Sequence, residues 1–308
     1  MASVLQSILT IIVTVVFIVG NFANVFISLV NCSDWVTRQR IYAVDGILTA
    51  LAVSRIVLLW IMFIGWFSTL FNPVINIGIT SHVLWTTVNH FSTWIATSLS
   101  IFYLFKIASF SSHILLQLKK RFKGVFVSTI LVCLILLLYT LVVISINERT
   151  RMKEHEGNVT WKTELGTTVF LSFLRGVTLV HLIPFVTSIV CCLLLTYSLH
   201  RHLSQMRQHS KGSQDPSTEV HVKALKTVVS YLLLFAMYSV SIIISGWSLG
   251  WFWNETVYLL FQTLAIMYPS SHSCVLICGN RKLKGAFMLG VWQARYLLNK
   301  KKPSNPYQ

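Results

Sequence analysis

The chain has 308 residues, of which 55% are hydrophobic and only 11% are charged, and its mean hydropathy is +0.69. Because a soluble domain carries about a quarter charged residues, this composition excludes a water-soluble enzyme and indicates a membrane protein. The 25 Lys and Arg against 9 Asp and Glu give a net charge of +16. A chain with so little polar surface is nevertheless not expected to bind nucleic acid.

Segments without any Asp, Glu, Lys or Arg locate the membrane spans. A spanning helix needs about 20 mainly apolar residues, and the uncharged segment 56–105 is long enough for two, separated by a turn at Asn72-Pro73. The runs are continuous and rich in Leu and Ile, which favours an all-α bundle over a β-barrel. The sequence predicts seven spans at about 4–30, 42–66, 83–106, 124–146, 174–200, 224–248 and 257–278.

The Lys and Arg residues set the orientation of these spans. Alternate connections, at 31–41, 106–123 and 201–226, together with the tail 281–308, hold 19 of the 25 cationic side chains. Because cytoplasmic loops carry the excess of Lys and Arg, we expect the N-terminus outside and the C-terminus in the cytoplasm. The predicted organisation is a seven-span domain at 1–280 and a basic cytoplasmic tail at 281–308, in a multi-pass protein of the plasma membrane.

The connections that we expect outside contain an N-glycosylation sequence and no cysteine. Asn158-Val159-Thr160 is an N-glycosylation sequence in the long connection 147–173, which we expect outside. None of the six cysteines falls in an outer loop, so an extracellular disulfide is not expected. The first segment has no Lys or Arg before its apolar run and is interpreted as a retained span rather than a cleaved signal peptide.

Arg55 is the only Lys or Arg expected within a membrane core. Burial of its charge is costly, so it should face the bundle and find a polar partner. Asn24 in the first span is the first candidate partner, and Asp45 is the second. A conformational switch and a static polar contact between two helices both remain open.

A second group of polar residues lies in the outer halves of the spans. Trp85, Asn89, Ser92 and Ala96 recur at spacings of four, three and four, which places them on one face of the third span. Tyr238 and Gln262 lie at comparable depths in the sixth and seventh spans. Apolar walls with a few neutral polar groups are typical of small-molecule sites. An interfacial anchor at Trp85 and simple hydrogen bonds between helices are the alternatives.

The segment after Gly279 has the pattern of a surface helix. Leu283, Phe287 and Val291 share one helical face, while Arg281, Lys282 and Lys284 lie elsewhere. This pattern predicts a short amphipathic helix on the cytoplasmic leaflet, in contact with membrane lipid. In the loop before the sixth span, Pro216 is expected to be the first helical residue of a cytoplasmic extension.

Catalytic sequence motifs are absent. The chain contains no H-E-x-x-H, no Walker-type glycine loop and no G-x-S-x-G, and its last span has no Lys that could hold retinal. We therefore expect no enzyme activity, no catalytic residue, no metal site and no cofactor.

Several sequence segments together resemble one receptor family. The third span ends in Phe102-Tyr103-Leu104-Phe105-Lys106 without D-R-Y, and the seventh contains His272-Ser273 and ends at Gly279-Asn280 without N-P-x-x-Y. Further matches are Gly20-Asn21-Phe22-Ala23-Asn24, Leu48-Thr49-Ala50-Leu51-Ala52-Val53-Ser54-Arg55, Leu182-Ile183-Pro184-Phe185 and the segment that begins His221-Val222-Lys223. In this combination the chain resembles the bitter taste receptors, the taste receptor type 2 family of G-protein-coupled receptors, over all seven predicted spans.

The resemblance implies a function and a set of site residues. Small bitter agonists would bind an outer-half cavity at Trp85, Asn89, Tyr238 and Gln262, the last at a place where some relatives carry Glu. A gustducin-like heterotrimeric G protein would dock at a cytoplasmic cleft that includes Tyr103, Lys106, His221 and Lys223. A pheromone receptor of the vomeronasal type and a seven-span transporter are the alternatives.

Overall fold

The computed structural model describes residues 2–38, 42–71, 79–107, 216–250 and 255–300, together with shorter stretches within 131–201. Its long elements are α1 (Ala2–Arg38), α2 (Ala43–Phe71), α3 (Ile79–Ile107), α7 (Pro216–Gly250), α8 (Glu255–Gly279) and α9 (Arg281–Lys300). The secondary structure of the described residues is helical throughout, which confirms the expected all-α class.

The first, third, sixth and seventh predicted spans fall within α1, α3, α7 and α8, and the second begins one residue before α2. Among the described residues, three stretches are long and apolar enough to cross a membrane, namely Val4–Thr37, Ala43–Leu70 and Lys226–Ser245. The start of the fourth predicted span and the start of the fifth lie outside the described residues, although 141–146 and 182–198 are helical. The number of spans and their orientation therefore remain predictions.

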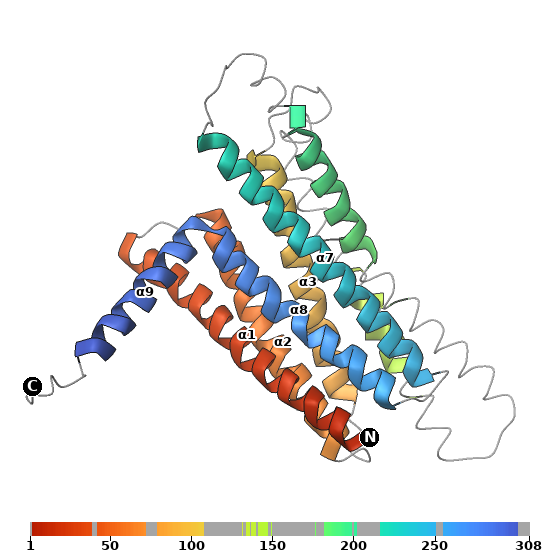
Figure 1. The fold of residues 1–308 in the computed structure, drawn as a ribbon. Coiled ribbons are helices and arrows are strands. Elements are labelled where there is room, and N and C mark those ends of the chain that lie inside the picture. The colour runs from red at the N-terminus through yellow and green to blue at the C-terminus, as the bar shows by residue number, and fades with distance from the viewer. Residues whose placement is uncertain are drawn as a thin grey trace, which may run out of the picture.

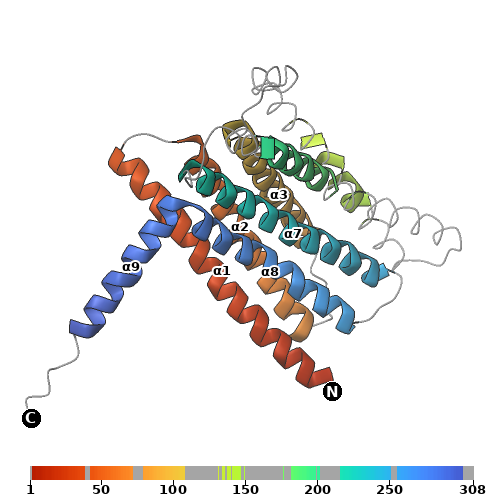
Figure 2. The same cartoon turned by 45° about the horizontal axis from the view of Figure 1, so that its top comes forward.

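The long helices form a bundle in which neighbours in sequence are often neighbours in space. Helix α1 packs against α2 and α8, α2 packs against α3, and α7 packs against α8 and α3. Figures 1 and 2 show the N-terminus at one end of this bundle and the junction of α8 with α9 at the other. Helix α9 projects away from the bundle at that junction.

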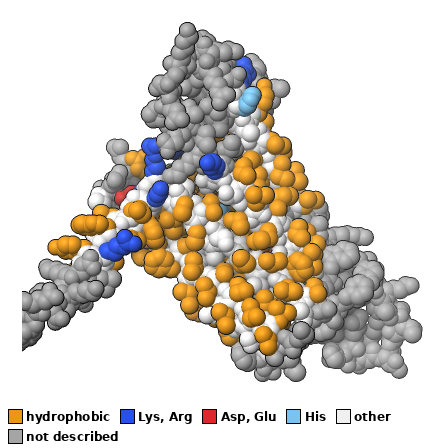
Figure 3. Space-filling view, in the orientation of Figure 1, with side chains coloured by type: hydrophobic (Ala, Val, Ile, Leu, Met, Phe, Trp, Pro, Cys, Tyr) orange, Lys and Arg blue, Asp and Glu red, His pale blue; other side chains and the backbone are white. Residues whose placement is uncertain are grey.

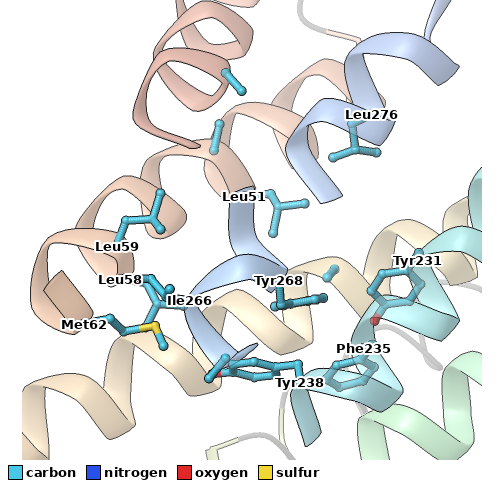
Figure 4. Packing of buried hydrophobic residues seen from close by; sticks show 14 of the residues in the cluster. Leu51, Leu58, Leu59, Met62, Tyr231, Phe235, Tyr238, Ile266, Tyr268 and Leu276 are labelled. Atoms are coloured by element: carbon cyan, nitrogen blue, oxygen red, sulfur yellow. The ribbon is translucent and has the colours of Figure 1, made fainter. Parts of the chain in front are cut away.

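Apolar side chains both fill the bundle and cover its outside. Leu58, Phe235 and Ile266, from α2, α7 and α8, are fully buried in the core that Figure 4 shows. Large aliphatic residues such as Leu233 point outward, and Figure 3 shows hydrophobic side chains over most of the visible face. An apolar exterior of this extent is appropriate for contact with lipid.

Small side chains allow α1 and α8 to approach closely. A Cβ atom at Gly20 would lie 2.0 Å from the Ser270 hydroxyl oxygen and 2.9 Å from Cδ1 of Leu59. Ser270 uses the same proximity to donate a hydrogen bond of 3.0 Å to the Val16 carbonyl oxygen. This tight contact brings the polar residues of α1 and α8 within reach of each other.

Helix α7 begins at Pro216, as predicted. Proline is favoured at the first helical position, where its missing N–H has no intrahelical partner to lose. Helix α9 begins after Asn280, whose side-chain oxygen accepts a hydrogen bond of 2.9 Å from the Lys282 backbone N–H. Asn280 therefore caps α9 immediately after α8 ends.

Candidate functional site

Arg55 of α2 lies fully buried among polar side chains of α8. Its guanidinium donates hydrogen bonds to the Ser273 hydroxyl, at 3.1 Å, and to the Tyr268 hydroxyl, at 3.5 Å. It also contacts Nδ1 of His272. Because a guanidinium can only donate, this Nδ1 must accept, and the proton of the neutral imidazole belongs on Nε2.

Ser273 connects Arg55 to α1. Its hydroxyl donates to Oδ1 of Asn24 at 2.7 Å and lies 2.9 Å from the Pro269 carbonyl oxygen, while it accepts from Arg55. The direct Arg55–Asn24 contact that we expected is therefore replaced by a bridge through one hydroxyl. The expectation that Asp45 is a second partner of Arg55 was wrong, since its carboxylate binds Lys282 of α9 instead.

Aromatic rings of α7 and α8 extend the cluster around Arg55. The Tyr268 ring stacks on Tyr238, with centroids 4.6 Å apart, and the Arg55 Cζ lies 5.4 Å from the Tyr268 centroid. The Tyr231 ring lies 4.8 Å from the His272 ring. Figure 4 shows Tyr231, Phe235 and Tyr238 along α7, facing Tyr268 of α8. The position of α7 is thus coupled by direct contact to the partners of Arg55.

The predicted ligand residues Asn89 and Tyr238 lie together. The Tyr238 hydroxyl donates to Oδ1 of Asn89 across the contact of α7 with α3, and both side chains are buried. Trp85, one helical turn earlier on α3, is half-buried against the same core. Gln262 lies nearer the start of α8, where its Nε2 donates to the Tyr258 hydroxyl at 3.1 Å and lies 3.5 Å from the Ser245 hydroxyl.

These contacts form a continuous path through five helices. It runs from Asn89 on α3 through Tyr238 and Tyr268 to Arg55, and then through Ser273 to Asn24 on α1. The sequence identified both ends of this path. It missed Tyr268, because an aromatic residue in an apolar span carries no signal that separates it from ordinary core.

A branch of this path reaches the helix at 182–198. The Tyr231 and Ser188 hydroxyls lie 3.3 Å apart, and Ser188 donates to the Thr97 hydroxyl of α3 at 3.3 Å. Sequence reasoning assigned no role to these three residues. Single hydroxyl groups are common inside helices, so only their convergence in space identifies them as a cluster.

The residues predicted to face a G protein are only partly described. Tyr103 is half-buried and packs against the core, whereas Lys106 is exposed, with its ammonium 5.6 Å from the centroid of the Phe102 ring. His221 and Lys223 belong to the first turns of α7, but their side chains lie outside the described part of the chain. Asn158 also lies outside it.

Lys282 forms a polar contact that we call the α9 latch. Its ammonium lies 2.8 Å from Asp34 Oδ2, 3.0 Å from Asp45 Oδ2 and 3.0 Å from Asn31 Oδ1, so it joins α9 to α1 and α2. Partial burial by itself would lower the pKa of Lys282. The hydrogen bonds and negative charges of Asp34 and Asp45 outweigh burial, and the pKa lies above its ordinary value.

The chemistry of the site suits recognition and conformational coupling. Its groups are hydroxyls, amides, rings and one cation, which can bind a small ligand and exchange hydrogen bonds when helices move. Within the described residues, no group of three or more His, Cys, Asp or Glu is placed to hold a metal ion.

Comparison with known proteins identifies the family. Residues 1–295 match the taste receptor protein family. The chain is 53% identical to taste receptor type 2 member 19 of Pan paniscus over 289 aligned residues. The aligned region covers 93% of this chain and 97% of that relative.

Two further relatives match at similar levels. Taste receptor type 2 member 31 of Pongo pygmaeus is 48% identical and taste receptor type 2 member 43 of Homo sapiens is 47% identical, each over 309 residues, which is 99% of this chain and 100% of the relative. These matches confirm the resemblance found in the sequence and support a receptor rather than an enzyme. The chain therefore belongs to the taste receptor type 2 family of G-protein-coupled receptors.

Proposed function

We propose that the chain is a bitter taste receptor of the plasma membrane, with seven spans, an outer N-terminus and a cytoplasmic C-terminus. Residues 1–280 form the receptor domain and 281–308 the basic tail. The family and the apolar helices support this proposal, as does the concentration of Lys and Arg in alternate connections. Helix α9 lies on the cytoplasmic leaflet, because Met288, Trp292 and Leu297 are all more than half exposed beside cationic residues.

The agonist site consists of Trp85, Asn89, Tyr238 and Gln262. The observation that carries this assignment is the buried hydrogen bond between Asn89 and Tyr238, since an agonist with a polar group can exchange it for its own. All four side chains are neutral, so the site favours neutral amphipathic compounds over strongly charged ones.

Activation follows from the contacts of Tyr238. An agonist that engages its hydroxyl also acts on the Tyr268 ring stacked against it, and thereby on the Arg55 cluster. The agonist shifts the receptor population only to the extent that it binds the active arrangement better than the resting one. In the active arrangement the inner end of α7 moves outward, and a gustducin-like G protein enters beside Tyr103, Lys106, His221 and Lys223.

The test is calcium release in cells that express this chain with a gustducin-type chimeric G protein, screened against a panel of bitter compounds. We expect a concentration-dependent response whose potency falls about tenfold or more in Asn89→Ala, given that one lost buried polar contact is worth about 1–3 kcal/mol, and in Trp85→Ala, which removes a large aromatic contact surface. Trp292→Ala, at an exposed Trp on α9, is the matched control and should leave potency unchanged.

Two outcomes would contradict the proposal. Silence toward the whole panel at normal surface expression would contradict the assigned coupling or ligand class. A response that Trp85→Ala and Asn89→Ala leave unchanged would place the agonist elsewhere in the receptor.

A further inference from the structure

The end of α8 touches the side of α7 without any side chain of its own. A Cβ atom built on Gly279 would lie 2.6 Å from Oγ1, 3.1 Å from Cγ2 and 3.4 Å from Cβ of Thr227. Real Cβ atoms essentially never approach within 3.0 Å of another heavy atom. By contrast, a Cβ at Gly65, Gly285 or Gly290 would meet open space.

Rotation of the Thr227 side chain can relieve this contact only in part. Threonine places two heavy atoms in three staggered positions around Cβ, and the two occupied positions are the ones that face Gly279. Any rotation to another staggered arrangement leaves at least one of them filled. Even in the most favourable arrangement, a filled position stays 3.1 Å from a Cβ atom at position 279, so the neighbouring side chain or helix must give by a few tenths of an ångström.

The α8 side of this contact is the anchored one. The Asn280 N–H donates to the Leu276 carbonyl oxygen at 3.0 Å, and the Lys284 N–H donates to the Asn280 carbonyl oxygen at 2.9 Å, so hydrogen bonds continue from α8 into α9. Three residues after Gly279, the α9 latch holds Lys282 against Asp34 and Asp45. Because these contacts hold the end of α8 in place, a side chain added at Gly279 would push α7 rather than α8.

We propose that the contact of Gly279 with Thr227, which we call the stop, sets how closely α7 packs against α8 near its first turns, at 216–227 (the inner segment of α7). The absence of a side chain at Gly279 keeps this segment close to α8. A side chain at 279 displaces the inner segment of α7 from α8. The effect on signalling rests on the proposed function: in a receptor of this kind, displacement of the inner segment of α7 raises the signal that the receptor gives without agonist. Thr227 is the other half of the stop, and its Oγ1 and Cγ2 atoms set the distance between the two helices.

The distance between α7 and α9 tests the stop directly. Fluorescent labels on a noncanonical amino acid at the exposed positions 226 and 284 report this distance in purified receptor in lipid nanodiscs. We expect Gly279→Ala to lengthen the distance. Adding Thr227→Ala should restore it, because that change removes Oγ1 and Cγ2 and leaves only the ordinary 3.4 Å contact.

Signalling without agonist tests the consequence. We expect Gly279→Ala to raise the basal signal per surface receptor about fivefold, the size of shift that overpacking of a tight contact produces in a two-state equilibrium. Gly279→Ala with Thr227→Ala should return it to the wild-type level. Gly285→Ala, a glycine-to-alanine change in open space on the neighbouring helix, is the matched control and should change neither readout.

The outcomes separate this inference from the proposed function. An unchanged label distance in Gly279→Ala, or a change that Thr227→Ala does not reverse, overturns the stop. A reversible change in distance without any basal or agonist-driven signal supports the stop and contradicts the proposed coupling instead. If Gly279→Ala does not fold, Thr227→Ile adds bulk from the opposite side and should lengthen the distance in the same way.

Discussion

At the scale of single residues, Arg55 faces the interior of the bundle, as its charge within a predicted span required. Its cation is fully buried, and the described side chains that receive its hydrogen bonds are neutral. Hydrogen bonds to a charged group are each worth about 1.5–3 kcal/mol, so removal of any one partner leaves the charge poorly compensated. Its partners Tyr268 and Ser273 both lie on α8, and the position of this helix therefore controls how well the charge is solvated.

Gln262 gives the sharpest prediction at this scale. Gln262→Glu should raise the potency of amine agonists about tenfold, because opposite charges about 4 Å apart attract substantially in a half-buried site, while the potency of neutral agonists stays unchanged. The Tyr258 hydroxyl, which now accepts from Gln262, can turn and donate to the new carboxylate. Dose–response curves at equal surface expression measure the change.

Gln262→Met is the matched control for this prediction, since it keeps the length of the side chain without adding charge. Amine potency that does not rise in Gln262→Glu, or that rises equally in Gln262→Met, would place Gln262 outside the agonist site.

Residue types and depths placed Asn89 and Tyr238 in the outer halves of their spans, and the family resemblance grouped them as ligand residues. The structure joins their side chains by a hydrogen bond, and their contact with an agonist stays a prediction. The partner of Arg55 was predicted less well, because it depends on the rotation of α8 about its own axis. A helix of low amphipathicity, apolar on most sides, leaves this rotation undefined in the sequence.

At the scale of elements, the α9 latch explains how a helix with few neighbours keeps its place. Among the described residues, helix α9 packs mainly against the end of α8 and makes a smaller contact with α1. Leu283 is fully buried, and Phe287 meets the edge of the Phe26 ring with centroids 5.8 Å apart. Lys282 adds two carboxylate contacts at the same end of the helix. Figure 3 shows Lys and Arg side chains gathered near this junction.

Lys282→Met should lower the free energy of unfolding by about 1 kcal/mol, which is typical of a partly exposed ion pair. This corresponds to about 2 °C in the melting temperature of a chain of this size. Because the pKa of Lys282 is raised in the folded state, the contribution is complete below the ordinary lysine pKa and is lost only as the pH rises through the higher folded value. The difference in melting temperature should therefore be the same at pH 7 and pH 9.

Lys284→Met removes an exposed cation from the same helix and serves as the control. Thermal unfolding of purified receptor in nanodiscs measures both variants. Equal melting temperatures for Lys282→Met and Lys284→Met would show that the latch contributes nothing to stability.

The uncharged segments located helices well and their ends poorly. Helix α1 has 37 residues, which at 1.5 Å per residue makes it about 55 Å long, whereas the hydrocarbon core of a bilayer is about 30 Å thick. Asp34 ends the uncharged segment 1–33 without ending the helix, which continues to Arg38. Charge thus bounds the apolar segments, while helix ends depend on capping residues such as Asn280.

At the scale of the whole molecule, the end of the bundle beside α9 and the interior of the bundle differ in their polar contacts. The end at which α9 leaves the bundle holds Lys282 with its acidic partners and the contact of Gly279 with Thr227. The polar path begins at Asn89 and Tyr238 and continues to Arg55 and Asn24 within the bundle. In the proposed topology, a ligand signal that enters from outside therefore meets a continuous set of contacts that it can displace.

The proposed topology makes a prediction that is independent of signalling. If the connection 147–173 lies outside, Asn158 receives a glycan, because N-glycosylation requires an Asn-x-Thr sequence on the luminal side of the membrane. Peptide N-glycosidase F should then increase the electrophoretic mobility of the wild-type receptor and leave that of Asn158→Gln unchanged. Asn254→Gln is the matched control, since Asn254-Glu255-Thr256 has the same pattern at the start of α8. A glycosidase shift that persists in Asn158→Gln but disappears in Asn254→Gln would move the modification to Asn254, and the absence of any shift in wild-type receptor would remove this support for the proposed orientation.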